Sequence, residues 1–151
     1  MNFADINGIS IHFNYNNNGA NKPTVVFSNS LGTDFRIWES CIENLSKDYS
    51  ILTYDKRGHG LSGLGNSPYV INDHVTDLID LMDHLKISEA VLVGLSVGGL
   101  VVQGVYHKRP DLVQGLILCD TAAKIGNEQM WNDRIAIARD GGLEALLEGN
   151  M

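Results

Sequence analysis

Short apolar runs separated by stretches of helical length constrain the fold of this chain more than any other feature of its sequence. Such runs are typical of strands that are covered on both faces of a sheet. They lie at residues 24–27, 50–54, 90–93 and 116–119. Between them the pattern predicts helices around 35–46, 71–86 and 97–109. Strands that alternate with helices predict an α/β fold with a mainly parallel, doubly wound sheet.

The two ends of the chain follow other patterns. Residues 2–15 predict a β-hairpin at one edge of the sheet, because apolar side chains from Ile9 to Tyr15 alternate with Ser10, His12 and Asn14. Asn7-Gly8 is a two-residue turn signal, since both positions of that turn need positive φ. Residues 127–148 look helical, with a break at Gly141-Gly142, and no strand is expected after Cys119.

Composition and charge exclude several classes of protein. The 18 acidic and 11 basic residues give a net charge of −7 without a Lys/Arg cluster, so nucleic acid and anionic membranes are poor partners. No apolar run approaches the roughly 20 residues of a membrane span, and residues 1–5 do not resemble a signal peptide. Cys41 and Cys119 have apolar neighbours and no ligand spacing, which predicts buried free thiols. We therefore expect a cytoplasmic protein.

The pattern Gly-x-Ser-x-Gly occurs at 94–98, between an apolar strand and a helix. This is the context of a nucleophile elbow, in which Ser96 projects above the sheet at a helix N-terminus that favours a developing oxyanion. The alternative is a serine in an ordinary strand-to-helix turn. Gly94, Ser96 and Gly99 also mimic a dinucleotide-binding fingerprint, but that motif follows the first strand of its unit, whereas this turn follows the fifth.

Two further turns carry polar residues. The loop 28–33 follows the first central strand, where a hydrolase supplies its second oxyanion N–H, here that of Leu31 beside Val97; the alternative is a plain polar turn. The turn 54–62 contains Asp55, Arg57 and His59. We interpret it as a tight glycine turn in which Asp55 and Arg57 satisfy backbone groups and each other; the alternative is a catalytic role for these residues.

With these residues in place, the chain resembles the 3-oxoadipate enol-lactonase family of α/β-hydrolases from Met1 to about Leu146. Its turn motifs at 54–60 and 94–99 are shared by the whole superfamily. Two other motifs are more specific and point to this family: Ser-Asn-Ser-Leu-Gly-Thr at 28–33 and Thr-Ala-Ala-Lys-Ile-Gly at 121–126. The resemblance implies an α/β-hydrolase fold, with the N-terminal part of its core at 1–126 and the beginning of a helical cap at 127–151.

The same resemblance implies a function. It is the opening of 3-oxoadipate enol-lactone to 3-oxoadipate in the β-ketoadipate pathway of aromatic catabolism, which is carboxylic-ester hydrolysis of class EC 3.1.1. Ser96 is the implied nucleophile, and the N–H groups of Leu31 and Val97 form the oxyanion hole. This chemistry needs no metal or organic cofactor. Because the substrate carries a carboxylate, Arg134 and Trp131 are candidates to receive it; the alternative is a solvated arginine and a packing tryptophan.

The family's pattern is not completed by this chain. A member has about eight strands in about 200–250 residues, with its triad histidine after the last strand. Here about six strands are predicted, so we expect a truncated form that lacks the C-terminal strands and that is inactive and poorly soluble alone. His107 lies about 16 Å along its helix from Ser96, too far to be the base. Asp120, at the tip of its strand, is a candidate acid, although the family's acid usually comes later.

Two other functions stay open on the sequence. One is another α/β-hydrolase, such as an esterase or a cofactor-free haloperoxidase-like enzyme. The other is a protein without turnover, either a truncated product or a pseudoenzyme that binds a ligand. The sequence does not indicate an oligomeric state.

Overall fold

A single mixed sheet organises the chain. The computed structural model describes residues 2–19 and 22–148, and within these ranges six strands pair side by side. Across the sheet they are β1 (Asn2–Ile6), β2 (Ile9–Asn16), β4 (Ser50–Tyr54), β3 (Thr24–Ser28), β5 (Ala90–Leu95) and β6 (Val113–Cys119). The last four run parallel, whereas β1 and β2 form an antiparallel hairpin at one edge. The predicted mainly parallel sheet with an edge hairpin is confirmed.

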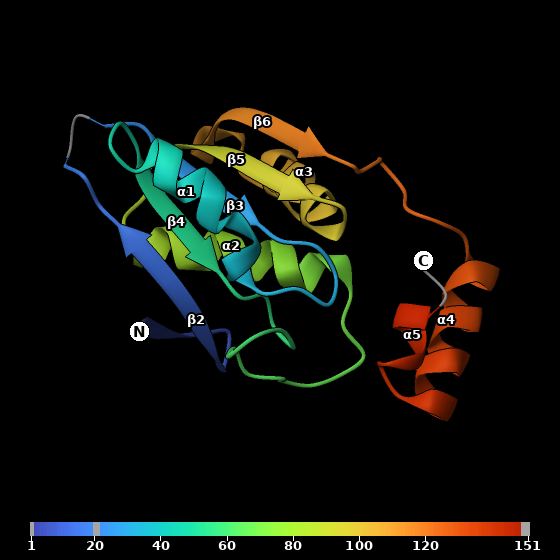
Figure 1. Ribbon diagram of the computed structural model, residues 1–151. Coiled ribbons are helices and arrows are strands. Elements are labelled where there is room, and N and C mark those ends of the chain that lie inside the picture. Colours follow the sequence, from blue (N-terminus) through green and yellow to red (C-terminus); the bar gives the residue numbers. More distant parts are fainter. Residues whose placement is uncertain (1, 20–21, 149–151) are drawn as a thin grey trace.

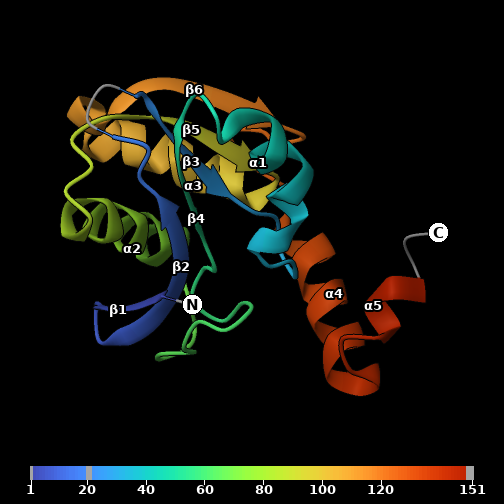
Figure 2. The same ribbon diagram turned by 60° about the vertical axis from the view of Figure 1, so that its left-hand side comes forward.

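Helices cover both faces of this sheet (Figures 1 and 2). On one face lie α2 (Ile71–His84) and α3 (Val97–Lys108), which pack against each other and against fully buried Val26, Leu52 and Leu92. On the other face lie the 3-10 turn η1 (Phe35–Trp38) and α1 (Glu39–Leu45), where Trp38 packs against Phe27 with ring centroids 4.8 Å apart. The sheet is therefore doubly wound, as the alternating pattern predicts.

Local sequence signals explain where these helices begin and end. Asp34 accepts a hydrogen bond from the Arg36 N–H and so caps η1. In α2, apolar residues at three- and four-residue spacing turn one face into the core. Proline cannot continue a helix, and α3 ends at Lys108 just before η2 (Pro110–Leu112). The helices thus fix the turn between β5 and α3 at the carboxyl edge of the sheet.

The last helices stand apart from these layers. The segment after β6 leads to α4 (Glu128–Gly141) and α5 (Ala145–Glu148), on the side to which β5 and β6 point (Figure 1). None of the α4 residues is buried. Asn127 caps α4 through its side-chain oxygen, which accepts from the Met130 N–H. The predicted boundary between a core and a cap at 126/127 stays a prediction, and Met1 and residues 149–151 lie outside the described residues.

Two other expectations concern exposure. The prediction that both cysteines are buried is wrong: Cys41 is exposed on α1 and Cys119 is only partly buried at the end of β6, although both are free thiols as predicted. The apolar run 116–119 predicts a strand that is covered on both faces, and this is wrong for β6. Among the described strands β6 lies at the other edge of the sheet, and its Ile117 and Leu118 are about half exposed, at 50% and 47%. No helix within the described ranges has the length and hydropathy needed to cross a bilayer.

Candidate active site

Ser96 lies at the sharp turn between β5 and α3. Its φ of 53° and ψ of −117° are unfavourable for any residue with a Cβ atom. Three hydrogen bonds stabilise this conformation: the Ser96 N–H donates to the Cys119 carbonyl (3.0 Å), and the Ser96 carbonyl accepts from the Gly99 N–H (2.9 Å) and the Thr121 hydroxyl (2.7 Å). The end of β6 therefore holds a strained serine at the N-terminus of α3, which is the geometry of a nucleophile elbow.

The glycines around Ser96 are required by close backbone contacts. A Cβ atom on Gly94 would lie 2.5 Å from the Gly98 carbonyl oxygen, and one on Gly98 would lie 2.1 Å from the Ser28 carbonyl oxygen. One on Gly99 would lie 2.4 Å from the Thr121 hydroxyl. Real Cβ contacts are never this short, so the turn closes only without these side chains. These contacts explain why glycines occupy positions 94, 98 and 99.

The loop after β3 lies directly against the elbow, because Gly98 touches the backbone of Ser28 and Asn29. Its own side chains close the loop: the Asn29 amide donates to the Thr33 carbonyl, and the Ser30 and Thr33 hydroxyls are 3.0 Å apart. Leu31 is exposed at 52%. The structure therefore brings Leu31 and Val97 onto adjoining segments of one edge of the sheet.

Asp55, at the end of β4, is occupied by structural contacts. Its carboxylate accepts from the backbone N–H groups of Phe35 and Leu61 (both 3.0 Å) and lies 2.8 Å from His12 Nδ1. His12 is a polar member of the alternating pattern of β2, yet its ring is buried between Phe3 and Phe35, with centroids 5.0 and 4.9 Å away. The interpretation of this turn as structural is supported.

The predicted partnership between Asp55 and Arg57 is wrong. Arg57 instead forms a bidentate pair with Asp77 on α2, with Nε–Oδ2 and Nη2–Oδ1 distances of 2.7 Å. The Asn7 amide also donates to Asp77 (3.0 Å), so this pair ties the hairpin turn and the β4 turn to α2. Sequence reasoning missed Asp77 because a partner on a helix 20 residues away leaves no local signal.

Sequence reasoning also passed over Lys56, which is only 1% exposed. Its Nζ donates to the carbonyl oxygens of Asn29 (2.7 Å) and Ser30 (3.1 Å) in the loop after β3. Burial lowers the pKa of Lys56 to about 7, and the neighbouring Asp55 carboxylate opposes this shift. The signal that could have identified it is its position close after the run 50–54, which is predicted to be covered on both faces and is buried throughout in the structure.

The lowered pKa predicts a rise in stability with pH. From about pH 7 to pH 10, an unfolded lysine is protonated while the folded Lys56 is neutral, so unfolding takes up a proton and its free energy rises by at most about 1.4 kcal/mol per pH unit. We expect urea denaturation at pH 7, 8 and 9 to show a steeper rise for the parent than for Lys56→Met. Parallel curves would mean that Lys56 titrates normally.

The histidines come from β2, the turn after β4, α2 and α3. His59 (after β4) and His74 (on α2) are partly and largely buried, and burial lowers the pKa of His74 to about 4. His84 and His107 are exposed near the ends of α2 and α3. Among the hydrogen bonds of the described residues, none joins a histidine side chain to Ser96; that the triad histidine is absent from this chain stays a prediction. The same ranges hold no cluster of three metal-ligating side chains.

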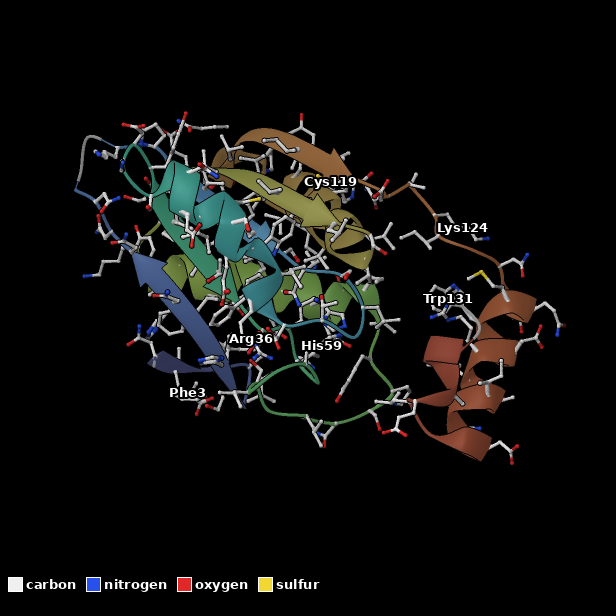
Figure 3. The ribbon with its side chains drawn as sticks, in the orientation of Figure 1. Phe3, Arg36, His59, Cys119, Lys124 and Trp131 are labelled. Atoms are coloured by element: carbon white, nitrogen blue, oxygen red, sulfur yellow. The ribbon has the colours of Figure 1, made fainter. Side chains whose placement is uncertain are left out.

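The other predicted site residues lie beyond β6. Asp120 follows that strand directly and is exposed, with a φ of 42°. Trp131 on α4 donates from Nε1 to the Ile125 carbonyl (2.9 Å), and the Arg134 guanidinium lies 5.9 Å from its ring centroid. In the view of Figure 3, Trp131 is on the side of α4 toward the core. The two candidates thus form a pair on one helix, separate from the elbow.

Comparisons with known proteins agree with this geometry. A family model described as alpha/beta hydrolase fold matches residues 23–139. The chain is 40% identical over 129 residues to 3-oxoadipate enol-lactonase 2 of Acinetobacter baylyi. The matched region covers 85% of this chain and 48% of that protein. The chain spans about half the length of the curated relatives it matches.

Solved structures give the same result. The enol-lactonase from Burkholderia xenovorans superposes with a TM-score of 0.93 at 39% identity, over 98% of this chain and 57% of that one. A thermophilic esterase from Thermogutta terrifontis superposes with a TM-score of 0.87 at 26% identity, over 99% of this chain and 58% of that one. The resemblance expected from the sequence is confirmed, and the chain belongs to the α/β-hydrolase fold family.

Proposed function

We propose that the whole protein is a cytoplasmic serine hydrolase that opens 3-oxoadipate enol-lactone to 3-oxoadipate. The observation that carries the proposal is the strained Ser96 elbow packed against the loop of residues 28–33. The similarity to enol-lactonases of Acinetobacter baylyi and Burkholderia xenovorans supports the substrate class. Residues 1–126 belong to its core and residues 127–151 to its cap.

In the proposed reaction, Ser96 Oγ attacks the lactone carbonyl carbon and gives its proton to a base. The N–H of Val97 at the start of α3 and the N–H of Leu31 bind the oxyanion. The bond between the carbonyl carbon and the ring oxygen then breaks, and the ring oxygen takes up the proton from the base. The resulting enol, still part of the acyl-enzyme, tautomerises to the ketone. Water hydrolyses the acyl-enzyme and regenerates Ser96. The family's pattern places this base, a histidine, after the last strand of the whole protein. Asp120 remains a candidate for the acid.

The test compares substrates on the whole protein. We expect kcat/KM for the enol-lactone to exceed that for p-nitrophenyl acetate, and we expect a fluorophosphonate probe to label Ser96. A preference for simple esters would favour the esterase function, which the Thermogutta terrifontis similarity makes the second candidate. A protein that is not labelled and does not turn over either substrate would be a pseudoenzyme.

Substrate charge gives a further prediction. Arg134→Leu in the whole protein should lower kcat/KM for the anionic lactone by about tenfold or more, because a charge-assisted hydrogen bond to the carboxylate is lost. The loss for neutral p-nitrophenyl acetate should be small. Arg139→Leu, at an exposed position on the same helix, is the matched control and should affect neither substrate. Equal losses on both substrates after Arg134→Leu would show that Arg134 is structural.

A further inference from the structure

Lys56 is a buried amine outside the proposed reaction. It is 1% exposed, at the carboxyl end of β4, and its Nζ contacts two successive carbonyl oxygens of the loop after β3. The distance from Nζ is 2.7 Å to the Asn29 carbonyl oxygen and 3.1 Å to the Ser30 carbonyl oxygen. A lysine is rarely placed in a core unless its charge and its N–H groups have partners. Because a neutral amine still has two N–H groups, both contacts survive deprotonation of Lys56.

The second contact fixes the direction of a particular N–H group. The Ser30 carbonyl and the Leu31 N–H belong to one peptide unit, which is planar and trans, so the two groups point in opposite directions. A hydrogen bond from Lys56 to the carbonyl therefore turns the Leu31 N–H away from the core. Charge on Lys56 also polarises this peptide unit, which makes its N–H a stronger donor.

Neighbouring contacts fix the rest of the same loop. Asp55, next to Lys56 in the chain, accepts from the Phe35 N–H (3.0 Å) at the far end of the loop. Gly98 of α3 packs against the Ser28 carbonyl at its near end. Between these ends the backbone on which Leu31 lies is held from within the loop by the Thr33 hydroxyl, which also donates to the Ser30 carbonyl (3.1 Å). Lys56 adds the contact from outside the loop, on the core side. Leu31 itself is half exposed, so its own side chain does not anchor it.

We propose that Lys56 is a positioning residue for the oxyanion hole, which it holds open by binding the Asn29 and Ser30 carbonyls from the core side. This rests on the proposed function, because only there does the Leu31 N–H bind an oxyanion. Lys56 does not touch the substrate. Its contribution is to the geometry of one donor, so its loss should change the transition state more than substrate binding.

Lys56→Met in the whole protein tests this, because it keeps the length of the side chain and removes its donors. We expect kcat for the enol-lactone to fall by about tenfold to hundredfold, less than the roughly hundredfold to thousandfold loss when an oxyanion donor is removed outright. KM should stay within about twofold. Lys56→Gln, with an amide donor on a shorter stem, should recover part of kcat. Lys22→Met is the matched control. Lys22 also donates to a backbone carbonyl, that of Lys47, but it precedes the start of β3, whereas the loop that Lys56 binds follows the end of β3.

Hydrogen–deuterium exchange gives a second readout that needs no substrate. Peptides covering residues 28–35 should exchange faster in Lys56→Met than in the parent, with unchanged exchange in α2. An unchanged kcat per folded molecule, or unchanged exchange in this loop, would overturn the inference and leave Lys56 a purely structural residue. Failure of the proposed function is distinct from this, since it would appear in the parent as absent lactone hydrolysis and an unlabelled Ser96.

Discussion

Ser96→Ala in the whole protein is expected to lower kcat/KM for the enol-lactone by about ten-thousandfold or more, because no other group can form the acyl-enzyme. The fold should persist. Alanine keeps the Cβ atom that Ser96 already carries at its φ of 53°, and the backbone hydrogen bonds to Cys119 and Gly99 do not involve the hydroxyl. The measurement is steady-state hydrolysis, with circular dichroism and urea denaturation to compare the folded states.

Two further variants sharpen this result. Ser40→Ala, at an exposed position on α1, is a matched control that should leave the rate unchanged. Ser96→Gly should be as inactive as Ser96→Ala but more stable by about 1 kcal/mol, since glycine adopts this backbone conformation with less strain. Activity of Ser96→Ala within tenfold of the parent would exclude Ser96 as the nucleophile. Equal stability of the two variants would mean that the elbow stores little strain.

The architecture of the core follows from signals that lie within one segment. Val26, Leu52 and Leu92 belong to apolar runs, and the structure places them in the interior of the sheet, fully buried. Asn7-Gly8 has the positive φ values that its turn signal predicts, 52° and 74°. These features are local, because hydrophobic periodicity and turn chemistry depend on residues a few positions apart. The position of Ser96 between a strand and a helix follows in the same way.

The partners within the candidate site could not be predicted, because they come from distant segments. Lys56 binds carbonyl groups 26 and 27 positions earlier in the chain, and Arg57 pairs with Asp77 on a later helix. From the sequence alone, a solvated Lys56 is as plausible as a buried one, and an Arg57–Asp55 pair is as plausible as the Arg57–Asp77 pair. Only the pairing of β4 with β3 and the packing of α2 decide between them.

The exposed Cys41 shows why burial on a short helix could not be predicted from the sequence. Its neighbours along the chain include Trp38 and Ile42, which pack on the sheet, so local apolarity predicts a buried thiol. On a helix of seven residues, however, only one stripe faces the sheet, and Cys41 lies off that stripe. Burial on a short surface helix depends on its rotation about its own axis, which a few apolar residues do not define.

Gly98→Ala is expected to cause the largest loss of stability of any single methyl group added near the elbow. The new Cβ atom would lie 2.1 Å from the Ser28 carbonyl oxygen, 2.6 Å from the Ser28 carbonyl carbon and 2.9 Å from the Asn29 carbonyl oxygen. All three are backbone atoms, so β3 or α3 has to move. Alanine in a helix gains up to about 1 kcal/mol over glycine, but overpacking against fixed backbone costs about 3 kcal/mol or more. The clash should therefore dominate.

Gly115→Ala on β6 is the matched control, because nothing lies within 4 Å of its added Cβ atom and its backbone is not in the left-handed region. Urea denaturation should show a loss of about 3 kcal/mol for Gly98→Ala and a change within about 0.5 kcal/mol for Gly115→Ala. Similar stabilities would mean that the contact between the elbow and the β3 loop is looser than the structure has it. Because that contact also places Ser28 and Asn29, the surviving folded fraction of Gly98→Ala should lose activity as well. The loss should appear in kcat, as for Lys56→Met, since both changes displace the same loop.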